Sequence, residues 1–584
     1  MTDFDTLIRG GIVVDGSRVP RYRADVGIKN GIIAKIGNLK TTSVGKVLDA
    51  SGLIVAPGAI DLHTHYDAQI HWDPYCTIDG WHGVTSVAIG NCGFGFAPVR
   101  PGDAERAMLC LTRNEAIPLA PMQQTMPFDW ETFPQWMDHL DRMPLGVNLS
   151  TFVPVTPLVA YVMKDWVEAK SRRPNEKEVT QIIRLLDEAL DAGAMGWSSQ
   201  RLPPESIVSF QRDYDGTPMI SDVLPDEFYL ALADALRERD RGCIQYTQVT
   251  ASADDVAAGA RRDLAFQVQL AERSGRPLLF NAIVINDEFP DVFRSQLKWL
   301  EETNARGTRI FGQASSVRIA VTITFEDWNL FDQSTVWREA TLGTLGEKKA
   351  KLSNPEVRRA MKHEYDSGEF TKARPHLPFE IEISTYIAVK IHHPDLKKYE
   401  GRTLATIAAA KRKHVIDAML DLSVADDLKT EWRTPLLNTK SEYAKEVMSS
   451  PYTLAGLSDG GAHMKFLTAG IWPTDLLTWM VRDTGILTLE DAHYRLSGMQ
   501  AWAAGFEDRG LLREGLAADL MIYDLNALAT GPVEIMHDLP AGDWRRVQRA
   551  EGYRWIMVNG QVTFENGTCT GATPGGLLRF GQAK

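Results

Sequence analysis

Two histidines separated by one residue offer the clearest chemistry in the sequence. His63 and His65 follow the apolar run "GLIVAPGAIDL", which is typical of a buried strand. Side chains two positions apart on a strand project from the same face, so both imidazoles would leave the strand end together. Imidazole is the usual nitrogen ligand of zinc. The spacing therefore predicts half of a metal site, with two structural histidines as the alternative.

A carboxylate suited to the same site lies far along the chain. Asp459 ends the apolar run in "SSPYTLAGLSDGGAH" (449–463) and precedes two glycines. Glycines leave room for a carboxylate at a strand tip to approach an ion. The alternative is that Asp459 caps the following helix. His463 lies in the same segment and could orient the site or contact a substrate.

The middle of the chain predicts elements that would position these residues. Helical patterns followed by a glycine turn and an apolar run recur in residues 175–200, 225–249 and 262–285. This alternation is typical of βα units and a parallel sheet. Arg201 follows one predicted strand and could pair with an anionic substrate, although a surface guanidinium is the commoner outcome.

The two ends of the chain have a different pattern. Short β-branched runs broken by Gly, Asn and Asp fill both ends, and an "NG" pair between apolar runs predicts hairpins there. We expect residues 1–56 and 509–584 to form one small β domain. Residues 57–508 would form the catalytic unit, and the irregular, aromatic-rich stretch from about 320 to 445 would be a large insertion near its rim.

Composition excludes several classes of protein. The formal charge is 63 − 76 = −13 without long charged blocks, which argues against a nucleic-acid surface. Five scattered cysteines predict no disulfide framework, and no apolar run approaches the ~20 residues of a membrane span. We expect a cytoplasmic enzyme with a small-molecule substrate and no nucleic-acid or membrane partner. No "GxSxG" motif supports a serine nucleophile.

Several motifs in this order resemble the amidohydrolase superfamily. They are "GLIVAPGAIDLHTH", "GVTSVAIGNCG", "LSDGGAH" and "GLAADLMIYD". More closely, the chain resembles the N-acyl-D-amino-acid deacylases of the D-aminoacylase branch. The segments "LTRNEAIPLAPM", "KYEGRTLATIAA" and "HDLPAGDWRRVQRAEGY" extend this likeness to most of the chain.

The resemblance implies a fold, a cofactor and residue roles. The fold would be α/β, a (β/α)8 TIM-type barrel with a small β-sandwich formed by both termini. His63 and His65 match the first-strand metal ligands, and Asp459 matches a ligand that is also the general acid and base. Cys92, in "GNCG", matches a thiolate ligand; a buried free cysteine that only packs is the alternative. A homo-oligomer is also consistent with the family.

The chain departs from the family at two ligand positions. The family supplies histidines from its fifth and sixth strands, where this chain has none, and Gln248 and Asn281 stand near those positions. Neutral amides are poor zinc ligands, so we expect one divalent ion per chain, most simply Zn²⁺. These amides could hydrogen-bond a substrate; satisfied amides of the core are the alternative.

The activity expected is hydrolysis of an amide C–N bond by a metal-activated water. An N-acyl-D-amino acid is the first substrate candidate, and another amide, a cyclic imide or a carbamate is the alternative. Decarboxylation on the same ligands is a third possibility. The alternative function is that of a scaffold, a barrel that has lost catalysis. Metal content distinguishes such a scaffold from an enzyme.

Overall fold

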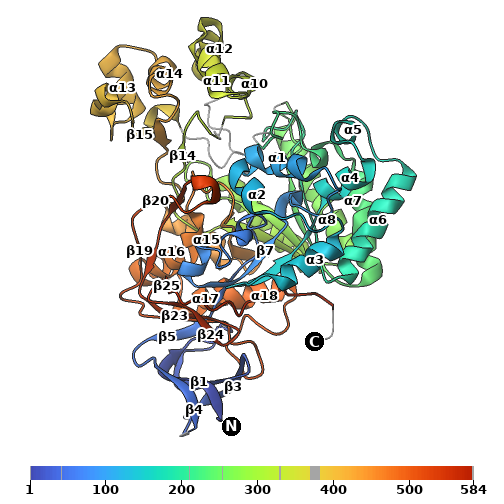
Figure 1. Cartoon of the computed structure of the whole chain (residues 1–584), viewed down its shortest axis with the longest axis vertical. Coiled ribbons are helices and arrows are strands. Elements are labelled where there is room, and N and C mark those ends of the chain that lie inside the picture. The colour runs from blue at the N-terminus through green and yellow to red at the C-terminus, as the bar shows by residue number, and fades with distance from the viewer. Residues whose placement is uncertain are drawn as a thin grey trace.

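The computed structural model describes residues 2–40, 43–208, 211–252, 254–327, 331–368 and 382–581. Two groups of strands organise the chain, a mostly antiparallel sheet made from both termini and a set of parallel strands followed by helices (Figure 1). Within the described residues, no helix combines the length and apolarity needed to cross a membrane.

The terminal sheet brings the two ends of the chain together. Strand β5 pairs in parallel with β1 and antiparallel with β18, and so joins N-terminal and C-terminal strands. Its members are β1 (Phe4–Val13), β2 (Tyr22–Lys29), β3 (Ile32–Gly37), β4 (Val44–Asp49), β5 (Ile54–Pro57), β18 (Leu520–Tyr523), β23 (Tyr553–Val558), β24 (Gln561–Glu565) and β25 (Thr568–Cys569).

The "NG" pairs form the predicted hairpin turns. Asn30 and Gly31 connect β2 to β3 with φ values of 51° and 79°. Asn559 and Gly560 connect β23 to β24 with φ values of 46° and 78°. Two consecutive left-handed residues match the twist of an antiparallel pair, which explains why Asn-Gly is favoured there. The hairpin prediction is confirmed.

The parallel strands follow one another in TIM-barrel-like order. They are β6 (Ala59–Asp61), β7 (Val84–Ile89), β8 (Asn148–Thr151), β9 (Val153–Pro154), β10 (Gly196–Arg201), β11 (Cys243–Gln248), β12 (Leu278–Ile283), β13 (Ile310–Ser315) and β17 (Thr453–Gly456). Every neighbouring pair among them is parallel. A parallel bridge between Thr64 and Gly460 links the segments beyond β6 and β17.

Amphipathic helices connect these strands. They include α3 (Phe133–Arg142), α6 (Glu176–Asp191), α7 (Asp226–Arg239), α8 (Val256–Ser274), α9 (Pro290–Ala305) and α15 (Ser441–Ser449). In α6, Asn175 caps the first turn and Glu178 completes a capping box. The helix buries Ile182, Leu186 and Leu190, whose spacing places them on one face.

The segment between β13 and β17 has a hydrophobic core of its own. It contains β14 (Thr322–Ile323), α10 (Thr335–Ala340), α11 (Leu345–Ser353), α12 (Pro355–Ser367), β15 (Ile387–Lys390), α13 (Leu404–Lys411), α14 (Val415–Ala425) and β16 (Glu431–Arg433). These helices stand at the top of Figure 1. Residues 328–330 and 369–381 of the expected insertion lie outside the described residues.

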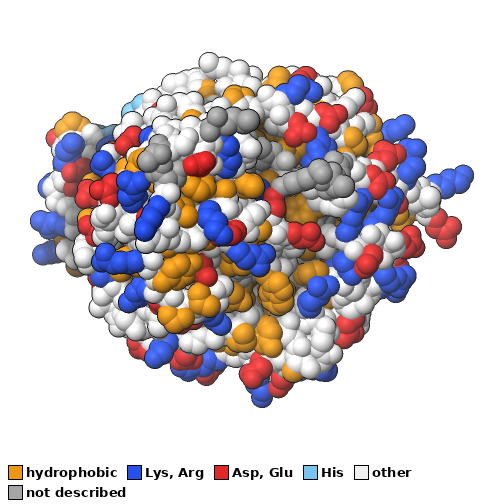
Figure 2. Space-filling model, turned by 90° about the horizontal axis from the view of Figure 1, so that it is seen from below, with side chains coloured by type: hydrophobic (Ala, Val, Ile, Leu, Met, Phe, Trp, Pro, Cys, Tyr) orange, Lys and Arg blue, Asp and Glu red, His pale blue; other side chains and the backbone are white. Residues whose placement is uncertain are grey.

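Charges are mixed on the surface. Figure 2 shows one face on which Lys and Arg side chains alternate with Asp and Glu, among scattered hydrophobic groups. A face of this kind offers no single-sign field for a polyanion such as nucleic acid.

Candidate metal centre and its cavity

His63 and His65 leave the carboxyl end of β6 side by side. Both are buried, with 1% and 2% of their surface exposed. Their rings meet edge to face with centroids 5.6 Å apart, and the backbone N–H of His63 donates to Asp61 Oδ1 at 2.9 Å. The spacing in the sequence thus translates into two imidazoles at one end of the strand.

Cys92 joins the two histidines from the end of β7. Its Sγ lies 3.3 Å from His63 Nε2, and the donor atoms of His63, His65 and Cys92 all lie within 4.8 Å of one another. Cys92 has a φ of 56°, a conformation that costs free energy for a residue with a side chain. The "GNCG" turn therefore holds the thiol where an ordinary strand end would not.

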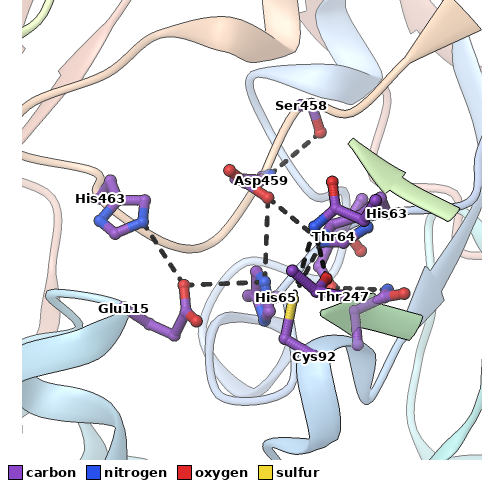
Figure 3. A network of polar contacts seen from close by, with 12 residues as sticks. His63, Thr64, His65, Cys92, Glu115, Thr247, Ser458, Asp459 and His463 are labelled. Atoms are coloured by element: carbon purple, nitrogen blue, oxygen red, sulfur yellow. Dashed lines mark hydrogen bonds and ion pairs between the residues drawn. The ribbon is translucent and has the colours of Figure 1, made fainter. Parts of the chain in front are cut away.

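Asp459 reaches the same atoms from the loop after β17. Its Oδ1 lies 3.4 Å from His63 Nε2 and 3.9 Å from His65 Nε2 (Figure 3). The backbone N–H of His65 donates to Gly460 O at 2.7 Å, and a Cβ added to Gly461 would lie 2.5 Å from His65 O. The glycines are needed because the loop packs directly on the histidine segment.

The spacing of these donors fits a metal ion. Atoms bound about 2.0–2.3 Å from a tetrahedral ion lie about 3.3–3.8 Å apart. The contacts of His63 Nε2 with Cys92 and Asp459, at 3.3 and 3.4 Å, fall in this range, and the His65–Asp459 contact is slightly longer.

Gln313 on β13 sets the tautomer of His63. Its Oε1 lies 3.0 Å from His63 Nδ1 and has no proton to give, so Nδ1–H donates and Nε2 keeps its lone pair. Burial lowers the pKa of His63 to about 4, so the ring is neutral at pH 7. A neutral imidazole held through its other nitrogen is the usual state of a metal-binding histidine.

The pKa values of two acidic groups of the centre are raised in the metal-free chain. Burial raises the pKa of the Cys92 thiol well above its ordinary value, and the charges of Glu115 and Asp459 add to the rise. Burial also raises the pKa of Asp459 to about 7, with a further contribution from Asp61. Because a third of the Asp459 side chain is exposed, water lessens this effect. A bound cation would favour both charged forms.

Glu115 belongs to the same network, although no role was predicted for it from the sequence. It follows α1 (Ala104–Asn114), is 1% exposed, and places Oε2 3.6 Å from His65 Nε2 and 3.5 Å from His463 Nε2. Figure 3 shows the carboxyl between the two imidazoles. No motif marks a single glutamate at a helix end, so only the packing of α1 reveals it.

Glu115 and the two imidazoles are spaced like ion pairs, but burial disfavours their charged forms. Burial raises the pKa of Glu115 well above its ordinary value, and the charges of Asp459 and Asp67 add to this. Burial lowers the pKa of His65 well below its ordinary value and that of His463 to about 4. Burial therefore favours a protonated carboxyl between neutral rings in the metal-free chain.

Glu115→Gln is expected to stabilise the metal-free chain more at pH 8 than at pH 5. The unfolded glutamate ionises near pH ~4.3, whereas the folded one keeps its proton to higher pH, so wild-type stability falls as pH rises between these values. Glutamine has no such penalty. Urea unfolding at both pH values measures the difference, with Glu105→Gln, an exposed site on α1, as the control. A gain independent of pH would contradict the protonated state.

Of the four predicted substrate contacts, Asn281 and His463 lie in the network around the metal centre. Asn281 on β12 donates to Thr247 Oγ1 at 3.0 Å and lies 4.0 Å from Cys92 Sγ. His463 contacts Glu115 through its side chain and its backbone N–H. Asn281 and His463 both line the cavity described below.

The side chains of Gln248 and Arg201 point away from the four candidate metal ligands. On β11, Gln245 and Thr247 face Cys92 and Asn281, and strand alternation turns Gln248 toward α8, where its amide donates to Asp263. Gln248 still lines the edge of the cavity. Arg201 pairs with Asp226 and lines a neighbouring hollow.

A cavity of about 560 Å³ opens onto His63, His65, Cys92 and Asp459. It extends past the ends of β11 and β12 to α8, α9 and the start of the insertion. A volume of this size accommodates a small organic molecule.

Comparisons with known proteins agree with this geometry. The amidohydrolase family model matches residues 46–564. An uncharacterized protein of Mycobacterium tuberculosis is 28% identical, covering 89% of this chain and 84% of that protein. D-aminoacylase of Alcaligenes xylosoxydans xylosoxydans is 24% identical, over 98% of this chain and 97% of its own. The structure of N-acyl-D-glutamate deacylase from Bordetella bronchiseptica, complexed with zinc and a phosphonate inhibitor, has a TM-score of 0.66 at 21% identity, over 99% of both chains.

Proposed function

Because the chain belongs to the amidohydrolase family, we propose that it is a metal-dependent hydrolase of an amide C–N bond. The observation that carries the proposal is the convergence of His63, His65, Cys92 and Asp459 from three separate strand ends onto one cavity. A scaffold protein has no use for buried donors spaced for an ion at the mouth of a cavity. The likeness to D-aminoacylase and N-acyl-D-glutamate deacylase supports an N-acylated amine as the substrate class.

We propose one divalent ion per chain, zinc in the simplest case. His63, His65, Cys92 and Asp459 would hold it, because imidazole, thiolate and carboxylate are all zinc donors. Thr247 and Asn281, the side chains that face Cys92 from β11 and β12, are weak zinc donors, so they offer little support for a second ion. When bound, the ion supplies Lewis-acid chemistry that polarises a carbonyl and acidifies water.

Asp459 would carry the proton during the reaction. It lines the cavity and lies next to both histidines, so it can take a proton from the attacking water. It then returns that proton to the departing nitrogen, which would otherwise leave as an unstable amide anion. His463 and Asn281 line the same cavity and would contact the substrate.

We propose that β6 to β13 and β17 close into a (β/α)8 barrel through the bridge between Thr64 and Gly460, with β8 and β9, which Phe152 alone separates, counted as one barrel strand. Residues 57–508 would form this barrel, with an insertion at about 320–445. Residues 1–56 and 509–584 would form a β-sandwich around the terminal sheet.

Metal content and amine release test the proposed function together. Protein purified without chelator is expected to hold about one equivalent of metal by mass spectrometry. The same protein should release a primary amine from N-acylated amines and lose this activity with a chelator. If the chain binds no metal after incubation with zinc or manganese, the scaffold alternative replaces the enzyme.

A further inference from the structure

The cavity beside the metal centre is apolar over most of its length. Beyond the ligands, side chains from several elements line it, namely Leu202, Val208, Leu264, Val284, Ile319 and Leu437. A substrate group enclosed here gains from leaving water, by about 0.8 kcal/mol per methylene. The site therefore favours a substrate with a large apolar substituent on one side of the amide.

The described lining of the cavity offers no cationic side chain to a substrate carboxylate. Among the described residues that line it, none is an arginine or a lysine, whereas Asp263 and Asp291 both line it. Taking a carboxylate out of water is costly unless a positive group compensates its charge, and the amide side chains that line the cavity, such as Gln211 and Asn438, carry no net charge. The acidic side chains add repulsion to this cost.

Two arginines on the adjoining segments already have partners. Arg201 at the end of β10 pairs with Asp226. Arg318, just before the lining residue Ile319, pairs with Asp475, with N–O distances of 2.6 and 3.2 Å. To serve a substrate, either guanidinium would have to give up a carboxylate that it already contacts.

We propose that the cavity binds the apolar substituent of an uncharged N-acylated amine, and that an N-acyl amino acid with a free carboxylate is a poor substrate. This inference rests on the proposed amide hydrolysis and goes beyond it in naming the substrate. It also separates the chain from the deacylases of D-aspartate and D-glutamate derivatives to which it is similar, whose named substrates carry additional carboxylates.

A matched pair of substrates tests the charge preference. N-octanoyl-D-leucinamide and N-octanoyl-D-leucine differ only in replacing a carboxylate by a neutral amide; the L-forms are measured in parallel. We expect release of the amine from the neutral compound with at least a tenfold higher kcat/KM. A preference for the carboxylate would overturn this inference and leave the proposed function intact.

Binding of both compounds to the metal-loaded protein distinguishes a failure of the proposed hydrolysis from a failure of the proposed charge preference. Calorimetry is expected to show tighter binding of the neutral compound, whether or not it is cleaved. If it binds more tightly and no acyl bond is broken, the proposed hydrolysis fails and the charge preference of the cavity stands. If the carboxylate binds at least as tightly, the inference fails on its own.

A chain-length series and a cavity variant test the apolar part. From acetyl to hexanoyl amides of one amine, kcat/KM should rise about fourfold per methylene. Ala260→Phe on α8 fills the cavity and should lower kcat/KM for the hexanoyl amide at least tenfold more than for the acetyl amide. Ala265→Phe on the exposed face of α8 is the matched control. A flat series, or equal losses on both substrates, would overturn the assignment of the cavity.

Discussion

Asp459→Asn is expected to abolish most turnover while the metal remains bound. Asparagine keeps the shape of the side chain and an oxygen that can face the ion, but it cannot accept a proton. General acid–base catalysis contributes about 10²- to 10⁴-fold, and kcat should fall by that order. Amine release measures the rate, and mass spectrometry of the same sample measures the metal.

The control for this variant removes the same charge elsewhere. Asp395→Asn, at an exposed position on the insertion, should leave both metal content and kcat unchanged. The two readouts separate a catalytic from a structural role, because a chain that merely misfolds loses metal as well as activity. Wild-type turnover in Asp459→Asn would contradict the role proposed for Asp459.

Local rules predicted the parts of the site that come from single segments. The period of a strand was enough to place His63 and His65 together, and the glycines after Asp459 were a sign of a close approach. In the same way, the Asn-Gly pairs were enough to predict the hairpins of the terminal sheet. Each of these features depends only on residues adjacent in the sequence.

Features that depend on packing between distant segments could not be predicted in this way. Glu115 enters the centre because α1 ends against the loop of His463, and Gln313 reaches His63 from β13. Nothing in the sequence near either residue records its partner.

Strand register sets a further limit on prediction. A shift of one residue along β11 exchanges the side chain that faces the centre for one that faces a helix. That single step separates Thr247, which faces Asn281, from Gln248, which faces Asp263. A family resemblance at low identity cannot fix register to one residue, although it can identify the strand.

Cys92→Ala is expected to weaken metal binding by at least ~10- to 100-fold. Removing a residue that only hydrogen-bonds to a metal ligand has an effect of this size, and a direct donor contributes more. The thiol is the donor that lies closest to His63 Nε2, at 3.3 Å, and it is held there by a strained backbone. Alanine keeps the Cβ and the same strain, so the variant removes the sulfur alone. Competition with a chromophoric chelator measures the affinity directly.

A second buried cysteine provides the comparison for this variant. Cys243 on β11 is 1% exposed and its Sγ lies 3.6 Å from Met195 O, in a different hydrophobic cluster from Cys92. Cys243→Ala should reduce stability through lost packing and leave metal affinity unchanged. If both variants bind metal like the wild type, Cys92 is a packing residue, and His63, His65 and Asp459 must hold the ion alone. A loss of affinity confined to Cys92→Ala assigns the thiolate to the ion and explains why a free cysteine stands in a left-handed turn beside two histidines.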